Sequence, residues 1–169
     1  FAALAILGIS YGAPLIAVVA MKPIAADLGT ARSGPAGAGS AAGAASANGT
    51  SAAIEYAVRV LSVSRIVVMG HVQCGGIQAI VDGSPIPGPD FVESWLKLAD
   101  GLKPLPTHLD HAHLLDHCEK GVVKLSLANL RTFPWIAERE DGGTLMLHGF
   151  RFGIASGKLE RLENGHFAA

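Results

Sequence analysis

Hydrophobic positions in the middle of the chain alternate between helical and strand-like patterns. Apolar residues recur at i, i+4 and i+7 over residues 54–61, which is typical of a helix with one buried face. Residues 65–70 form a nearly continuous apolar run, as in a strand covered on both faces. A further helix is predicted from about residue 75 to 81. This alternation predicts an α/β fold, a mainly parallel β-sheet flanked by helices, with residues 1–169 as a single domain.

The second half of the chain continues with mostly helical patterns. Residues 91–98 carry a helical apolar face, and residues 111–129 have the pattern of a longer helix. Pro134 is expected to open or kink a short helix, because its fixed φ suits the first helical turn. Apolar residues 144–149 and 151–154 then predict a hairpin or a pair of edge strands.

The first 21 residues are apolar and uncharged, and a stretch of this length could span a bilayer. Gly8, Gly12 and Pro14 interrupt it, and no basic residues flank its amino side, so we favour a globular interpretation. That interpretation is a short helix, a turn at residues 12–14 and a buried strand over residues 15–20 in a parallel sheet. Membrane association through residues 1–21 is the alternative.

Residues 33–49 are almost entirely Ala, Gly and Ser. A stretch without large side chains or charges buries too little surface to order itself, which predicts a flexible connector.

The formal net charge is −1 and half of the residues are hydrophobic. Such a chain creates no field that would attract nucleic acid, so we expect no nucleic-acid partner. The two cysteines, Cys74 and Cys118, occur without a secretory pattern. Free thiols of this kind favour a reducing, cytoplasmic location over a disulfide scaffold.

The strongest candidate chemistry is His71 and Cys74, where the predicted strand turns into the predicted helix. Ligands bind parallel sheets at the carboxyl ends of their strands, and a helix N-terminus lowers the pKa of a nearby thiol. His71 and Cys74 are therefore predicted to bind a metal, or Cys74 to act as a nucleophile. Residues 108–118 hold four histidines, two aspartates and a thiol. His113 and His117 share a helical face there, which allows a second metal site or an ordinary solvated surface.

Four stretches resemble the β-class carbonic anhydrases: residues 49–58, 66–76, 126–136, and 148–149 with 154–157. The resemblance implies a zinc-dependent lyase that hydrates carbon dioxide reversibly to bicarbonate, and assembly as a homodimer or homotetramer. It also implies that His71 and Cys74 are the second and third protein ligands of Zn²⁺.

The first zinc ligand of that family belongs to a Cys-x-Asp-x-Arg motif, whose aspartate and arginine serve catalysis. Met21, Pro23 and Ala25 occupy those places here, so neither the third protein ligand nor the catalytic dyad is identifiable. Three explanations remain open. One is natural loss of catalysis, which leaves an inactive scaffold or interaction module. Another is an altered sequence through about residue 48, by a frameshift or a truncation in the encoding DNA. In the last, Cys118 replaces the missing ligand.

Overall fold

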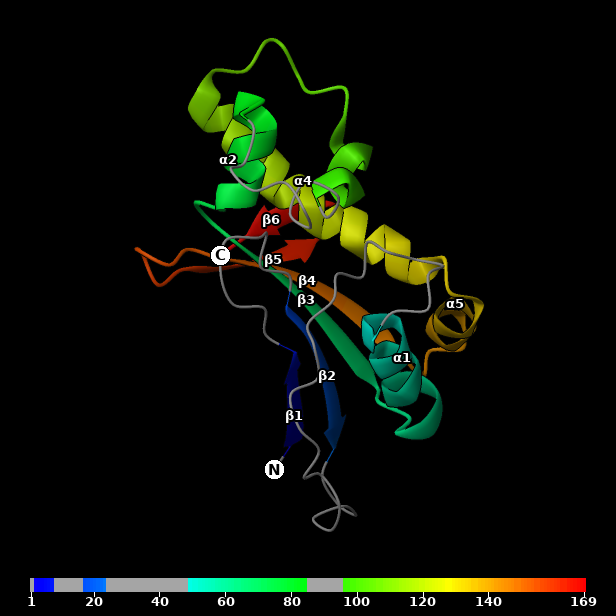
Figure 1. The fold of residues 1–169 in the computed structure, drawn as a ribbon. Coiled ribbons are helices and arrows are strands. Elements are labelled where there is room, and N and C mark those ends of the chain that lie inside the picture. Colours follow the sequence, from blue (N-terminus) through cyan, green and yellow to red (C-terminus); the bar gives the residue numbers. More distant parts are fainter. Residues whose placement is uncertain (1, 8–16, 24–48, 85–95) are drawn as a thin grey trace.

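The computed structural model describes residues 2–7, 17–23, 49–84 and 96–169 (Figure 1). The predicted turn at residues 12–14, most of the connector at residues 33–49 and most of the predicted helix at residues 91–98 lie outside the described residues. In chain order, the structure has β1 (Ala2–Leu7), β2 (Ala17–Pro23), α1 (Gly49–Glu55), the π-helical segment η1 (Tyr56–Val60), β3 (Arg65–His71), α2 (Gly75–Asp82), the 3-10 helix η2 (Lys97–Leu102), α4 (His111–Arg131), α5 (Pro134–Asp141), β4 (Met146–Phe152), β5 (Leu159–Glu163) and β6 (His166–Ala168).

The described strands form one sheet in the order β1-β2-β3-β4-β5-β6. β3 and β4 pair in parallel at its centre, and the other neighbouring strands pair antiparallel. The chain between β3 and β4 contains α2, η2, α4 and α5, which is the long crossover that a parallel pair requires. Short turns join β4, β5 and β6, so these strands pair as hairpins. The predicted α/β class is confirmed, and the sheet is mixed, with the parallel pair in the middle.

Helix α4 covers the two central strands (Figure 1). Its buried residues recur at helical spacing: Cys118, Glu119, Val122, Val123, Ser126, Leu127 and Leu130. Two strand glycines allow this close packing. A Cβ on Gly70 would lie 2.7 Å from Cγ2 of Val123, and one on Gly149 would lie 3.0 Å from Cδ1 of Leu127. Helix and strands are therefore in contact directly beside the carboxyl end of β3.

The helices predicted over residues 54–61, 75–81 and 111–129 are present. α2 and α4 agree closely with the predicted ranges, and α5 has Pro134 in its first turn, as expected. Among the described residues, no helix is both long and apolar enough to span a membrane.

Three sequence predictions are wrong at the level of single elements. Residues 2–7 form a strand instead of a helix, because an apolar run carries no periodicity that separates the two. The next strand, Ala17–Pro23, pairs antiparallel with β3 instead of lying in a parallel sheet. The predicted hairpin within residues 144–154 is one strand, β4, because Gly149 accommodates α4 instead of forming a turn.

Candidate metal centre

The turn between β3 and α2 brings the predicted ligands together. β3 ends at His71, and the amide of Val72 donates to the carbonyl oxygen of Phe152 on β4 over 2.9 Å. Gln73 then adopts a left-handed conformation, with φ of 59°. Cys74 occupies the N-cap position of α2 in an extended conformation. We refer to residues 71–74 as the ligand turn.

The His71 imidazole and the Cys74 thiol are direct neighbours. A hydrogen bond with the Cys74 side chain is the largest cause that raises the pKa of His71 above its ordinary value, against the opposing effect of burial. Nδ1 of His71 lies 3.0 Å from the carbonyl oxygen of Val72. Because a carbonyl can only accept, Nδ1 carries the hydrogen and Nε2 keeps its lone pair. A metal-binding histidine commonly has this arrangement.

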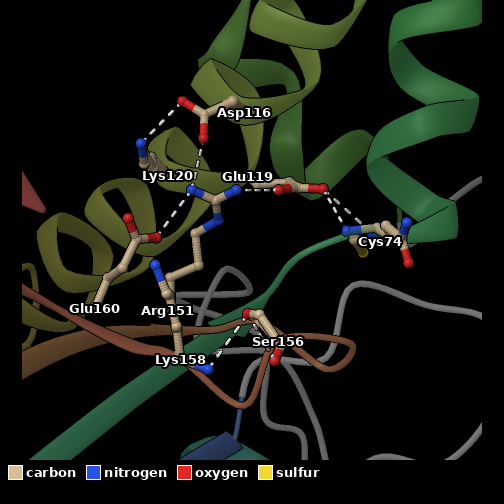
Figure 2. A network of polar contacts seen from close by, with 10 residues as sticks. Cys74, Asp116, Glu119, Lys120, Arg151, Ser156, Lys158 and Glu160 are labelled. Carbon is tan, nitrogen blue, oxygen red and sulfur yellow. Dashed lines mark hydrogen bonds and ion pairs between the residues drawn. The ribbon is translucent and has the colours of Figure 1, made fainter. Parts of the chain in front are cut away.

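An ion-pair network centred on the buried residues Glu119 and Arg151 contacts the ligand turn through Glu119 (Figure 2). Oε1 of Glu119 accepts hydrogen bonds from the backbone amides of Gln73, at 2.7 Å, and Cys74, at 3.4 Å. Its other oxygen accepts from Nη2 of Arg151 over 2.9 Å. Nη1 of Arg151 donates to Asp116 and Glu160 as well. The network thus connects α4, β4 and β5 to the ligand turn.

Sequence reasoning missed Glu119 and Arg151. One feature of the sequence could have indicated Glu119: it lies on the face of α4 whose other buried residues are small or hydrophobic. A carboxylate at such a position needs a buried partner. The sequence did not show that this partner is Arg151.

The described residues supply two donors for zinc and not the three that a catalytic site uses. They contain no group of three or more His, Cys, Asp or Glu side chains able to hold a metal ion. His71 and Cys74 are the nitrogen and sulfur donors that zinc prefers, so the donor chemistry fits at these two positions.

Neither of the other positions considered from the sequence completes the set. Met21 pairs with Arg65, at the start of β3, because β2 runs antiparallel to β3. Six residues of strand, about 20 Å, separate Arg65 from His71. Pro23 pairs with Ala2 still farther along, and Ala25 lies outside the described residues.

Cys118 is fully buried, and burial together with the charge of Glu119 raises the pKa of its thiol.

The histidine-rich segment before and within α4 has a structural role in the described part of the chain. Asp110 caps α4 by accepting from the amide of His113 over 2.9 Å, and its other oxygen lies 2.7 Å from Nδ1 of the same histidine. His111 pairs with Asp82. His113 and His117 are exposed and belong to no metal-binding group among the described residues.

An open cavity of about 600 Å³ lies away from the ligand turn. Its lining comes from the end of α5, the start of β4, and β5 with the turn after it: Glu140, Gly143, Leu145, Met146, Leu147, His148, Arg161, Leu162, Glu163 and Asn164. The start of β4 is beside the start of β3, opposite His71. The cavity is therefore separate from the candidate metal centre.

Comparisons with known proteins agree on one family. The sequence profile described as carbonic anhydrase matches residues 37–159. Carbonic anhydrase of Pseudomonas aeruginosa is 38% identical over 118 residues, covering 68% of this chain and 54% of that protein. Beta carbonic anhydrase 5, chloroplastic, of Arabidopsis thaliana is 34% identical over 120 residues, covering 66% of this chain and 39% of that protein. The chain thus spans about half or less of these relatives.

Solved structures give the same result. The β-carbonic anhydrase CcaA superposes with a TM-score of 0.67 at 29% identity, over 74% of this chain and 64% of that one. A tetrameric β-carbonic anhydrase from Sordaria macrospora gives a TM-score of 0.59 at 29% identity, over 71% of this chain and 61% of that one. A parallel strand pair under a long helix, a His-x-x-Cys turn at its carboxyl end and these matches lead to one conclusion: the chain belongs to the carbonic anhydrase family, in its β class.

Proposed function

We propose that this chain carries part of the zinc site of a lyase that hydrates carbon dioxide reversibly to bicarbonate. The observation that supports this most is the ligand turn, in which His71 and Cys74 meet at the carboxyl end of β3 in a β-class carbonic anhydrase fold. Each donor has a defined environment: Nδ1 of His71 is held by a carbonyl, and Cys74 begins a helix.

His71 and Cys74 would hold the metal through Nε2 and Sγ. When bound at such a site, zinc supplies a Lewis acid that activates water near neutral pH. The chain's own contribution is to orient the donors and to limit water around Cys74, which is 3% exposed. The described residues place no third His, Cys, Asp or Glu donor beside these two.

We also propose a homodimer or homotetramer. The face of the central strands opposite α4 carries Val67, Met69 and Phe150 as a small apolar cluster of its own. Met146 at the start of β4 is 42% exposed. A second subunit could cover such a surface, and the Sordaria macrospora relative is tetrameric. For this chain we also propose a cytoplasmic location, which the free cysteines Cys74 and Cys118 favour, whereas two Arabidopsis thaliana relatives are named chloroplastic and mitochondrial.

A second candidate function is a scaffold or interaction module that has lost catalysis. The specific observation in its favour is that the described residues provide two metal donors and that Met21 lies at the far end of β3. A site with two protein ligands holds zinc weakly, because each ligand adds to the binding free energy.

Metal content and carbon dioxide hydration, measured on the same purified protein, distinguish the two candidates. The enzyme proposal expects zinc in the wild type and stopped-flow hydration above the uncatalysed rate, both lost in His71→Ala and Cys74→Ser. Cys118→Ala is the matched control, because its thiol is buried in the core. Loss of zinc in that control would identify Cys118 as the substitute ligand. Zinc-free, folded and inactive wild-type protein would support the scaffold.

A further inference from the structure

We infer that Glu119, held in place by Arg151, is a positioning residue for the His71–Cys74 zinc ligands. The inference rests on the proposed function and adds a residue outside the ligand turn to it. Glu119 lies 46 residues from Gln73 in the sequence, on a different element, yet one of its oxygens accepts from two consecutive amides of the turn. The backbone that presents Cys74 is thus fixed by α4.

The conformation of the turn explains why such a contact is needed. Gln73 is a non-glycine residue with φ of 59°, a backbone region that L-residues seldom adopt. This conformation points the amides of Gln73 and Cys74 toward the same carboxylate oxygen. Without an acceptor there, both amides would face the interior beside α4 unpaired, and a more extended Gln73 would turn Cys74 away from His71. Glu119 therefore selects the conformation in which the two donors meet.

Burial and charge show that Arg151 holds Glu119 in the position where it contacts the ligand turn. Glu119 is 3% exposed and Arg151 is 5% exposed, and Arg151 also faces the carboxylates of Asp116 and Glu160 (Figure 2). A buried carboxylate needs a partner, and the guanidinium of Arg151 lies 2.9 Å from Glu119 in the interior. The guanidinium donates to Oε2 of Glu119 and so orients Oε1 toward the amides of the ligand turn. Nε of Arg151 is buried and has no hydrogen-bond partner among the described residues.

A buried ion pair is weak evidence for stability, because apolar residues of similar volume often serve the core equally well. The contact of Glu119 with the ligand turn gives the Glu119–Arg151 pair a more specific role than stability. Gly70 places β3 directly against Val123 of α4, one turn of helix from Glu119. Strand, helix and carboxylate thus form a rigid frame, and the ligand turn is attached to that frame through Glu119.

Two double variants isolate the amide acceptor from charge and packing. Glu119→Gln with Arg151→Met removes both buried charges and keeps an oxygen acceptor, whereas Glu119→Leu with Arg151→Met removes the acceptor as well. Both lose the same contacts to Asp116 and Glu160, so their difference reports the hydrogen bonds to the turn. Glu140→Ala, which breaks the exposed pair with Arg131 near the far end of α4, is the control for a lost ion pair.

The probe is Co²⁺, which shows a thiolate charge-transfer absorption when bound to cysteine. The Gln-containing double variant is expected to bind Co²⁺ within a few-fold of the wild type, and the Leu-containing variant about 10–100-fold more weakly. The amides of Gln73 and Cys74 should exchange with solvent faster in the Leu variant only, with the amides of β3 unchanged. Equal Co²⁺ affinity and equal exchange in the two double variants would overturn the inference.

The second readout separates this inference from the proposed function. If the wild type binds no Co²⁺, the proposed zinc site is wrong, and amide exchange alone then decides whether Glu119 fixes the turn. A Leu-containing variant that does not fold, beside a folded Gln-containing one, would show that the acceptor serves overall stability, and would count against a role confined to the ligands.

Discussion

His71 and His148, on the neighbouring strands β3 and β4, have pKa values shifted in opposite directions. A hydrogen bond with Cys74 raises the pKa of His71. Burial lowers the pKa of His148, and the charges of Arg161 and Arg65 lower it further. The two imidazoles thus lie in different environments. His71 forms a hydrogen bond with the Cys74 side chain, whereas the surroundings of His148, which lines the cavity, favour the neutral imidazole.

Replacing His148 should change how stability depends on pH. The folded state favours the neutral imidazole, whereas the unfolded chain binds a proton near the ordinary pKa of 6.5. The stabilisation is therefore present above about pH 6.5 and is lost as pH falls through the lower folded pKa. His148→Gln should flatten the decline in unfolding free energy between about pH 7 and 5, as measured by urea denaturation. His117→Gln, at an exposed position on α4, is the control. An unchanged slope in His148→Gln would contradict the assignment.

At the scale of elements, the contact of α4 with β3 positions the ligand turn. The sequence predicted both elements from apolar spacing, but not the closeness of their contact, which depends on the missing side chain at Gly70. Gly70→Ala places a Cβ 2.7 Å from Cγ2 of Val123, and the resulting overpacking should lower the unfolding free energy by roughly 1–3 kcal/mol.

Chemical denaturation measures this change. Gly75→Ala is the matched control, because a Cβ there meets no atom within 4 Å. It should be neutral or stabilising by up to about 1 kcal/mol. Equal destabilisation by both substitutions would show that contact with Val123 is not what makes Gly70→Ala unfavourable.

The start of α4 gives an independent test of the histidine-rich segment. Asp110→Ala removes the side chain that caps the helix and should cost about 1 kcal/mol of unfolding free energy. Asp110→Asn keeps an acceptor and should cost much less. If both changes were neutral, and if Zn²⁺ stabilised the wild type and neither variant, the segment would be a metal site instead of a cap.

Particular residues show how far the sequence could lead. His71 and Cys74 could be predicted to meet, because a strand, a sharp turn and a helix N-terminus are all local features. Glu119 and Arg151 could not be assigned to the site, because their contact joins elements more than 30 residues apart. The direction of β2 could not be predicted either, since an apolar run indicates a buried strand but not its neighbour in the sheet or its direction relative to that neighbour.

For the whole molecule, the direction of β2 decides whether Met21 can contribute to the site. Antiparallel pairing puts Met21 beside Arg65, about 20 Å of strand from His71. Met21→Cys should therefore leave zinc affinity unchanged, as measured by competition with a chromophoric chelator, with Met21→Ser as the control. A large gain in zinc affinity in Met21→Cys alone would mean that β2 runs parallel to β3 and that a single residue separates this chain from a complete site.

We propose that this member of the β-class carbonic anhydrase family binds zinc through the ligand turn. The decisive experiment determines the zinc content per chain by mass spectrometry, on purified wild type and on Cys74→Ser. We expect about one zinc per wild-type chain and nearly none in the folded variant. A zinc-free wild type, or a variant that keeps the full zinc content of the wild type, would contradict it.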